Sequence, residues 1–400
     1  MPLPWALLVT LLLAAAGYVV GRSRAFASAT DSRTLHSRPN YHGMNVALLA
    51  LTPALVVMVA GSLLRMAGVL SADGGPVVGL VALGAAILGL GLGMTRISAG
   101  YMARNSVERI ILGLLMFCSS IAIATTVGIV LSLIFETGNF FQRYSWTQFF
   151  FGLEWQPRFE GNSRLGMLPL LWGTLYISFI ALLVAVPIGL FGAIYLSEYA
   201  TSRVRSIAKP LVELLAGIPT IVYGLFALVT VGPMLRDAIA QPLGLGSSAS
   251  SVMTAGLVMG IMLIPFVSSL SDDIINAVPQ SLRDGALGLG STPSETIRKV
   301  VLPAALPGIV GAVLLAASRA IGETMIVVLG AGAAATLSLN PFEAMTTITV
   351  KIVSQLTGDN DFSSPETLVA FALGLTLFVI TLALNVVALI IVRKYREQYE

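Results

Sequence analysis

Long apolar runs separated by short polar segments dominate the chain, and nine runs approach or exceed the roughly 20 residues that a helix needs to cross a bilayer. The predicted spans are residues 3–20, 46–64, 77–94, 110–135, 167–196, 211–235, 252–270, 308–333 and 367–392. Pro187, Pro219 and Pro265 lie inside the fifth, sixth and seventh of these spans. Proline is tolerated inside a span where neighbouring helices satisfy the carbonyl that it frees. The pattern predicts an all-α, polytopic transmembrane helix bundle.

Composition supports a membrane protein. Hydrophobic residues make up 56% of the 400 residues and charged residues 11%, whereas soluble domains carry about 25% charged residues. The single cysteine, Cys118, excludes a disulfide within the chain, and the two histidines, His36 and His42, fall in one polar linker. The sequence therefore predicts no metal site and no nucleic-acid partner.

The first apolar run could be a signal peptide, but its charges are in the wrong order. Signal peptides place basic residues before the apolar region, whereas Arg22 and Arg24 follow it here. We therefore expect residues 3–20 to be a retained span.

Lysine and arginine set the orientation, because they concentrate in cytoplasmic loops. With the C-terminus in the cytoplasm, the inside segments hold 16 Lys and Arg residues and the outside segments hold 6. The predicted inside segments are 21–45, 95–109, 197–210, 271–307 and 393–400. The count favours an outside N-terminus and an inside C-terminus.

Two outside segments have their own character. Residues 136–166 are crowded with aromatic side chains, which prefer the membrane–water interface, so we expect a segment lying flat on the bilayer. Residues 341–356 are amphipathic and fit either a short helix under the external opening or an ordinary surface helix.

Arg319 and Glu323 are the charged pair inside the eighth predicted span. Their spacing of four predicts one helical face, and an arginine near mid-bilayer costs about 2.5–3.5 kcal/mol or more on insertion scales. A guanidinium binds phosphate-like anions through two parallel hydrogen bonds. One interpretation is that Arg319 binds an oxyanion while Glu323 holds its rotamer, with Ser318 and Gly322 allowing close approach. The other is a self-satisfied pair that joins helices.

Glu213 starts the sixth predicted span, one helical turn after Lys209. This spacing predicts an ion pair between the two side chains at the membrane surface.

Residues 284–303 carry a fixed spacing. Asp284, Gly285 and Ala286 are followed by Gly290, and Val300, Leu302 and Pro303 come after it. This resembles the EAA loop of ABC importer permeases, with Asp-Gly-Ala in place of Glu-Ala-Ala. The spacing predicts a short helix, a tight turn at the glycine and a second short helix stopped by Pro303. In that family the hairpin docks on the ATPase subunit.

A phosphate-cradling loop is missing from the chain. The stretch GLGLGMT at 89–95 lacks the lysine of a P-loop. ATP hydrolysis is therefore expected in a separate subunit, and the chain itself is predicted to be neither an enzyme nor a cofactor binder.

From about 145 to 395 the chain resembles the permeases of phosphate-specific transport (Pst) systems. The segments that carry the resemblance are FFFGLEWQP, ELLAGIPTIVYGLF and SRAIGETMIVV, at 149–157, 213–226 and 318–328. GETM and the Gly-x-x-Trp-x-Pro segment resemble the C-type subunit. The resemblance implies a type I importer core of six spans at 110–400, with the coupling loop at 278–307, and a role for Arg319 and Glu323 in phosphate passage. Residues 1–109, with three extra spans, depart from the family pattern and receive no function.

The resemblance also implies a set of partners: a second, A-type permease subunit, a dimer of ATPase subunits and an extracytoplasmic phosphate-binding protein. The expected location is the bacterial cytoplasmic (inner) membrane, and the expected cargo is inorganic phosphate. Two alternatives stay open. One is a permease for another oxyanion, sulfate or molybdate. The other is a non-transporting scaffold in phosphate sensing.

Overall fold

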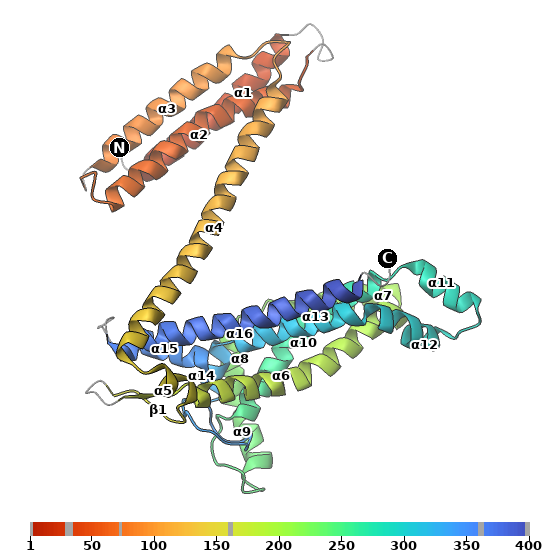
Figure 1. Ribbon diagram of the computed structural model, residues 1–400. Coiled ribbons are helices and arrows are strands. Elements are labelled where there is room, and N and C mark those ends of the chain that lie inside the picture. The colour runs from red at the N-terminus through yellow and green to blue at the C-terminus, as the bar shows by residue number, and fades with distance from the viewer. Residues whose placement is uncertain (1–2, 29–34, 72–73, 159–162, 359–363, 397–400) are drawn as a thin grey trace. The chain divides into compact units, whose positions relative to one another are not determined.

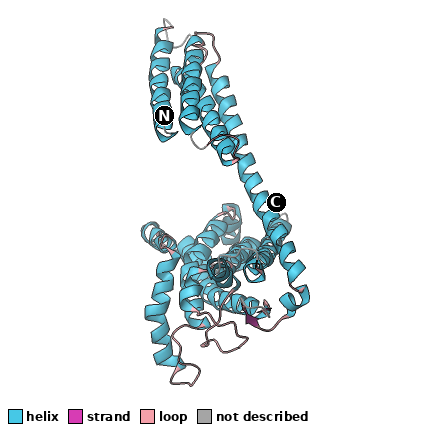
Figure 2. Cartoon of the chain, turned by 90° about the vertical axis from the view of Figure 1, so that its left-hand side faces the viewer, coloured by secondary structure: helices cyan, strands magenta, loops and turns pink. Residues whose placement is uncertain are grey.

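The computed structural model describes residues 3–28, 35–71, 74–158, 163–358 and 364–396. Helices make up most of the described chain, as Figure 2 shows. Within these ranges nine helices are long and apolar enough to cross a membrane, which confirms the predicted bundle of about nine spans. The chain divides into two compact units, Met1–Val127 and Gly128–Glu400. This division and the predicted one at residue 109 both fall within one long helix, α4, which runs from Ala103 to Arg143.

The first unit is built on three mutually packed helices, α1 (Leu3–Ala27), α2 (Pro39–Met66) and α3 (Gly75–Thr95). Small residues let these backbones approach closely, as is typical of helices in membranes. At Gly89 of α3 a Cβ atom would lie 1.9 Å from the carbonyl oxygen of Leu49 on α2. Gly89, the first glycine of the GLGLGMT stretch, therefore allows α3 to pack closely against α2.

The polar linker predicted at residues 21–45 is shorter in the structure, because α2 begins at Pro39 rather than near residue 46. Proline is favoured in the first turn of a helix, where its missing N–H would be unpaired anyway. His42 therefore lies inside α2, with 1% of its surface exposed.

The second unit contains the rest of α4 and all later elements (Figure 1). These are α5 (Trp146–Phe151), β1 (Trp155–Gln156), β2 (Arg164–Leu165), α6 (Leu168–Ile194), η3 (Tyr195–Tyr199), α7 (Ser202–Ala216), α8 (Thr220–Phe226), η4 (Ala227–Val231), α9 (Gly232–Leu235), η5 (Arg236–Ala240), α10 (Val252–Asn276), α11 (Gln280–Gly288), α12 (Pro293–Thr296), η6 (Ile297–Val301), α13 (Leu302–Ile321), α14 (Met325–Gly330), α15 (Ile348–Gly358) and α16 (Pro365–Arg396). The η segments are single π-helical turns within longer helices.

Helix α10 forms the centre of this unit. It packs against α6, α13, α7, α14 and α8, and 67% of its most apolar stretch is buried within the chain. By contrast, α16 buries only 6% of its corresponding stretch. A helix that is apolar on every face is either enclosed by protein or faces lipid. The arrangement places α10 inside the bundle and leaves most of α16 for lipid or for another protein.

The aromatic segment differs from its prediction. Phe140 and Phe149 are completely buried and pack with Leu373 of α16 in a compact cluster. The short β1–β2 hairpin joins this cluster through Trp155 and Leu165. Phe140, Phe141, Phe149 and Phe150 form a small core at one end of the bundle, because each packs against another ring within about 6 Å. Trp146 and Phe151 of the same segment are 60% and 70% exposed, so only these two of its described aromatic residues keep the exposure that the prediction gave to the whole segment.

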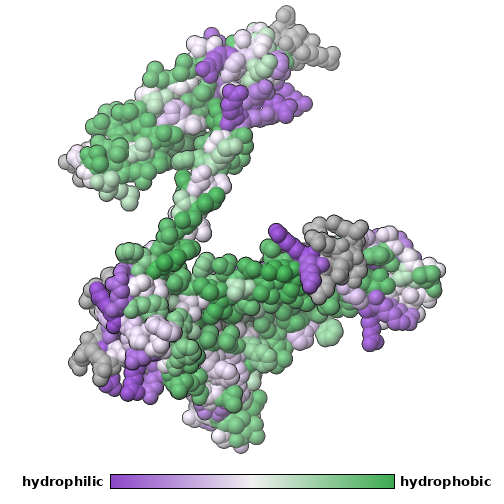
Figure 3. All heavy atoms as spheres, viewed as in Figure 1, coloured by the Kyte–Doolittle hydropathy of each residue, from purple (hydrophilic) through white to green (hydrophobic). Residues whose placement is uncertain are grey.

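The two ends of the second unit carry different parts of the chain. Figure 1 shows α7, α11, α12 and the C-terminus at one end and α5, β1 and α15 at the other. In Figure 3 hydrophobic residues cover the length between these ends, and hydrophilic residues gather at both. The predicted inside segments 197–210 and 271–307 begin or lie at the same end as residues 393–396, the described part of the last inside segment, as one side of a membrane requires.

Two predicted spans have different limits in the structure. The sixth, predicted at 211–235, begins at Thr220 and ends at Ala240, because the chain turns at Gly217–Pro219 and α7 is a separate helix. The eighth, predicted at 308–333, is helical from Pro293 to Ile321 and then breaks. Pro303 does not stop the helix. It lies in the first turn of α13, directly after the π-helical turn η6, which changes the backbone pairing ahead of the proline.

Gly89→Ala is expected to weaken the packing of α2 against α3, because the added methyl group meets the Leu49 carbonyl oxygen. Overpacking of this kind costs about 1–3 kcal/mol. The measurement is loss of helical circular dichroism on heating the chain in lipid nanodiscs. Gly84→Ala is the control, because no atom lies within 4 Å of a Cβ at that position of the same helix. Equal melting of both variants would contradict the assignment.

Candidate functional site

A cavity of about 250 Å³ lies beside α10 in the second unit. It is bounded by the end of α7, the start of α8, the middle of α10 and the last turn of α13. The lining residues are Glu213, Ala216, Ile218, Thr220, Met262, Pro265, Phe266, Ser269, Leu270 and Arg319. The cavity is therefore mostly apolar, with one cationic and one anionic side chain and two hydroxyl groups.

Arg319 provides the positive charge of this cavity. Its guanidinium carbon lies 5.5 Å from the centre of the Phe266 ring, which is a cation–π contact. Among the described residues, no carboxylate lies within ion-pairing distance of Arg319. Phe266 is near the middle of α10, so Arg319 lies at mid-depth in the bundle, as the sequence predicted. The guanidinium is thus held by a ring face and keeps its hydrogen-bond donors for another group.

The helix that carries Arg319 is broken directly after it. Helix α13 ends at Ile321, and α14 begins at Met325. The Glu323 carboxylate accepts hydrogen bonds from the backbone N–H groups of Thr324 and Met325, at 3.1 and 3.0 Å. The Glu323 carboxylate therefore pairs with backbone N–H groups that the break in the helix would leave without a partner. Non-helical backbone at membrane depth needs such partners, because lipid provides none.

The prediction that Glu323 holds the Arg319 rotamer on one helical face is wrong. The helix ends between the two residues, and the Glu323 carboxylate turns to the backbone of α14. Ser318 is half-buried and Gly322 is the exposed residue that ends α13. Of the four predicted pathway residues, Arg319 alone is among the residues that line the cavity.

Helix α15 lies against the broken segment. The Thr349 hydroxyl donates to the carbonyl oxygen of Glu323 at 2.9 Å. The predicted amphipathic helix at 341–356 therefore exists as α15, shifted toward the C-terminus, and supports the break rather than lying free on the surface.

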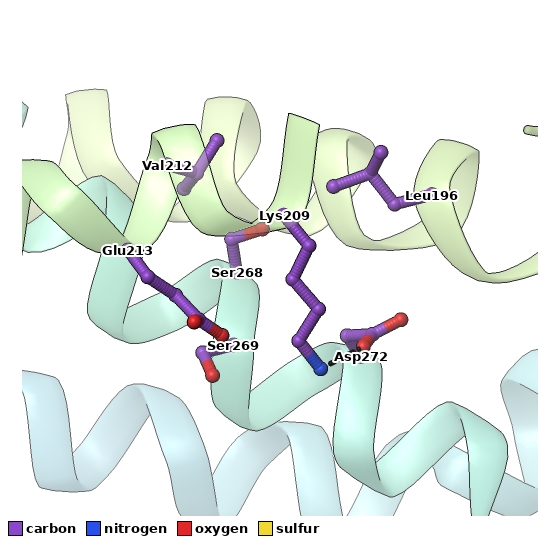
Figure 4. A pocket seen from close by; sticks show the side chains of 7 residues that line it. All are labelled: Leu196, Lys209, Val212, Glu213, Ser268, Ser269 and Asp272. Carbon is purple, nitrogen blue, oxygen red and sulfur yellow. Dashed lines mark hydrogen bonds and ion pairs between the residues drawn. The ribbon is translucent and has the colours of Figure 1, made fainter. Parts of the chain in front are cut away.

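Glu213 provides the negative charge of the cavity, whereas its spacing to Lys209 predicted an ion pair between the two at the membrane surface. Lys209, its predicted partner, instead donates to Asp272 at 2.7 Å and to Asp273 at 3.4 Å. Figure 4 shows Glu213 extending from α7 toward Ser269 of α10. One sequence signal was available: Arg205, Lys209 and Glu213 follow one another at intervals of four, which gives α7 a charged stripe on a single face.

The inner end of α10 carries a buried carboxylate. Asp272 is 2% exposed and accepts from Arg205 at 3.1 Å and from Lys209 at 2.7 Å, as Figure 4 shows for the lysine. The hydrogen bond to Asp272 raises the pKa of Lys209 above its usual value of 10.5. A buried carboxylate is stable only with such partners. Asp272 therefore fastens α7 to α10, two of the helices that supply lining residues of the cavity.

Residues 284–303 were predicted to form a helical hairpin with a turn at Gly290. The structure confirms the first half of this hairpin. Helix α11 contains Asp284, Gly285 and Ala286, and Gly290 follows it with a φ of 87°. A positive φ favours glycine, so this residue allows the turn. Thr292 and Glu295 then form a capping box that starts α12. The second half differs, because α12 continues through η6 into α13, where Leu302 and Pro303 form the first turn.

Arg283 ties this loop to the rest of the bundle. Its guanidinium donates to Glu198 of η3 at 2.9 Å and to the carbonyl oxygen of Ile275 at 2.8 Å. The Arg283 and Glu198 side chains are 12% and 13% exposed. This pair was not predicted from the sequence. Its members lie 85 positions apart, and no local spacing connects them.

Comparison with known proteins places this architecture in a family. Residues 185–397 match the model of the binding-protein-dependent transport system inner membrane component, which is more than half of the chain. The chain belongs to this family. Its matched segment contains both the Arg319 cavity and the α11–α12 hairpin. Residues 7–70 match a second model, described as a phosphate ATP-binding cassette transporter, so part of the first unit also has relatives.

Individual relatives of this chain agree with the family model. The chain is 37% identical over 252 residues to the phosphate transport system permease protein PstC of Mesorhizobium japonicum, and the match covers 58% of this chain and 74% of that protein. It is 35% identical over 284 residues to PstC 1 of Mycobacterium tuberculosis, covering 63% and 83%. It is also 33% identical to the probable ABC transporter permease protein YqgH of Bacillus subtilis, covering 58% and 74%.

Among solved structures, this chain resembles a bacterial alginate ABC transporter in complex with an alginate pentasaccharide-bound periplasmic protein. The TM-score is 0.50 at 17% identity, over 73% of this chain and 97% of that one. At this identity the similarity concerns the fold, which agrees with the predicted ABC permease architecture.

Asp272→Asn is expected to lower the stability of the bundle by about 2 kcal/mol or more, because it leaves Arg205 and Lys209 without their buried counter-charge. The measurement is thermal unfolding in nanodiscs. Asp273→Asn is the matched control, since its side chain is 66% exposed and, among the described residues, its carboxylate bonds to Lys209 alone, at 3.4 Å. An exposed pair contributes about 0–1 kcal/mol. Equal destabilisation by both changes would contradict this role of Asp272.

Proposed function

We propose that this chain is the membrane-spanning permease subunit of an ATP-driven ABC importer that moves inorganic phosphate into the cell. Support comes from the family match, from the phosphate transport permeases among its relatives and from the second family model over residues 7–70. ATP binding and hydrolysis belong to a separate subunit in this proposal. The chain contributes the pathway and the surface through which the ATPase acts.

The observation that carries the proposal is the Arg319 guanidinium in a cavity at the middle of the bundle. A charge at this depth is costly and marks a pathway or a partner by default. The guanidinium is planar, permanently charged and suited to two-point contact with a phosphate group. In the proposal, phosphate enters the cavity and is bound by the donors of Arg319 that Phe266 leaves uncovered.

The break after Arg319 contributes to the same pathway. We propose that Ser318 and Gly322 allow close approach of the solute at the end of α13 and that Glu323 keeps the broken backbone paired while it does so. Non-helical backbone at membrane depth occurs where it is buried in protein or lines a water-filled cavity. In this proposal Glu323 supports the pathway through α14 rather than through Arg319.

The α11–α12 hairpin is the proposed docking site for the ATPase dimer. Leu289, at its turn, is 90% exposed, and Leu287 of α11 is 45% exposed. Apolar side chains at the tip of a polar loop fit a groove on a partner protein. The further partners are a second, A-type permease subunit and an extracytoplasmic phosphate-binding protein. The proposed location is the bacterial cytoplasmic membrane, with the C-terminus inside and the N-terminus outside.

A continuous helical rod connects the docking site to the cavity. From Pro293 to Ile321 the chain is helical without interruption, and Arg319 lies at its far end. At 1.5 Å per residue this rod spans about 40 Å. We propose that displacement of the hairpin turns this rod and α6 together, because Arg283 attaches the hairpin to the end of α6 through Glu198.

A permease for sulfate or molybdate is the nearest alternative, because a guanidinium alone does not distinguish one oxyanion from another. The phosphate transport relatives favour phosphate. A non-transporting scaffold in phosphate sensing is the alternative of another class. It would keep the hairpin and would not depend on Arg319.

Arg319→Gln is expected to lower ATP-dependent phosphate uptake by about tenfold or more, because a neutral amide loses the charge-assisted hydrogen bonds to phosphate. The measurement is uptake of radiolabelled phosphate by proteoliposomes that contain the chain with its partner subunits. Arg393→Gln, an exposed arginine of α16 that lies outside the cavity and the coupling loop, is the control. Full uptake by Arg319→Gln, combined with loss of a signalling output, would support the scaffold instead.

Arg283→Gln is expected to uncouple ATP hydrolysis from uptake, because it detaches the hairpin from Glu198 and from the Ile275 carbonyl group. The transported phosphate per ATP hydrolysed should fall, while the rate of hydrolysis changes less. Both rates are measured in the same proteoliposomes, and the matched control is again Arg393→Gln. An unchanged ratio of transport to hydrolysis would contradict the proposed connection.

A further inference from the structure

Glu213 and Arg319 line the same cavity but do not form an ion pair. Their side chains come from α7 and α13, and both are exposed rather than buried in protein. In the described part of the chain, no basic group lies within 4 Å of the Glu213 carboxylate. Two opposite charges on one cavity, held apart by the fold, leave room for a group that contacts both.

The surrounding structure keeps Glu213 available. Lys209, one turn earlier on α7, is engaged by Asp272 and Asp273, so it does not neutralise Glu213. The bond between Lys209 and Asp272 also fixes the position of α7 against α10 one turn from Glu213 (Figure 4). The carboxylate extends toward Ser269, whose hydroxyl belongs to the cavity lining. The cavity thus offers donors at Arg319 and an acceptor at Glu213.

This arrangement suits an oxyanion that has both unprotonated oxygens and a hydroxyl group. At neutral pH inorganic phosphate carries at least one proton, so it can accept from a guanidinium and donate to a carboxylate. Sulfate carries none, and an ionised carboxylate accepts hydrogen bonds but donates none. Sulfate on Arg319 would therefore face Glu213 with repulsion and no hydrogen bond.

We propose that Glu213 is a specificity-determining residue, which accepts a hydrogen bond from the hydroxyl group of phosphate bound at Arg319 and disfavours fully ionised oxyanions. The inference rests on the proposed function, since it needs phosphate in this cavity. It adds a residue of α7 to the pathway and a physical reason for choosing phosphate over sulfate.

The experiment measures equilibrium binding of radiolabelled phosphate to the transporter in nanodiscs, without the extracytoplasmic binding protein, whose own selectivity would mask the effect. Sulfate and monofluorophosphate are the competitors. Monofluorophosphate keeps the size of phosphate but has fluorine in place of the hydroxyl group. The variants are Glu213→Gln, Glu213→Asp and Arg319→Gln, with Asp273→Asn as a carboxylate-to-amide control on α10 outside the cavity. Thermal unfolding confirms that each variant is folded.

We expect the wild type to prefer phosphate over both competitors and Glu213→Gln to lose about ten- to hundredfold of that preference, the range for a hydrogen bond to a charged group. Glu213→Asp should keep the preference with weaker binding, and Asp273→Asn should match the wild type. An unchanged preference in Glu213→Gln, with binding lost in Arg319→Gln, would overturn the role of Glu213 and leave the proposed function standing. Unchanged phosphate binding in Arg319→Gln would overturn both.

Discussion

The structure depends on holding a full positive charge at mid-depth in a bundle made almost entirely of apolar helices. Arg319 meets this constraint without a bound carboxylate. Its guanidinium lies over the Phe266 ring and opens to a cavity. A cation–π contact of this kind is worth about 0.5–2 kcal/mol, less than the insertion cost of about 2.5–3.5 kcal/mol for a central arginine. The remaining stabilisation must come from water, from a partner or from the transported anion, which is why the site is suited to binding an anion reversibly.

Other features around the cavity follow from the same constraint. A helix that ends at mid-depth exposes backbone donors, and Glu323 pairs with two of them. Helix α15 covers the other side of the break through Thr349. The buried Asp272 fastens α7, so Glu213 stays on the cavity wall at a distance from the guanidinium. Lys209, Asp272 and Glu323 each have a fixed partner, whereas no ion pair is found among the described residues for Glu213 and Arg319, which face the cavity.

Much of this was predictable from the sequence, and the failures have identifiable physical causes. Apolar runs predicted all nine spans, because length and composition alone decide whether a helix can cross a bilayer. The spacing around Gly290 predicted its turn for a similarly local reason. The hydrogen-bond partners of Glu323 were not predictable from its spacing to Arg319, since the helix breaks between the two residues. Lys209 was assigned to its neighbour Glu213, whereas tertiary packing supplied Asp272, 63 positions away.

The connection between the α11–α12 hairpin and the cavity depends on tertiary structure and was not predictable from the sequence. The sequence predicted a second short helix ending at Pro303, but the chain instead forms one rod from Pro293 to Ile321. The π-helical turn before Pro303 lets the proline enter without a break. The Arg283–Glu198 pair then joins the same hairpin to α6. Movement imposed at one end of the second unit therefore has two rigid routes toward the level of Arg319.

The most direct test of the central claim is a distance between the arginine and the anion. Solid-state nuclear magnetic resonance of the assembled transporter, with ¹⁵N-labelled arginine and bound phosphate, detects dipolar coupling between guanidinium nitrogen and phosphorus. We predict a nitrogen–phosphorus coupling that corresponds to direct hydrogen-bonded contact and that disappears in Arg319→Gln. Bound phosphate with the same coupling in both proteins, or with none in either, would contradict it.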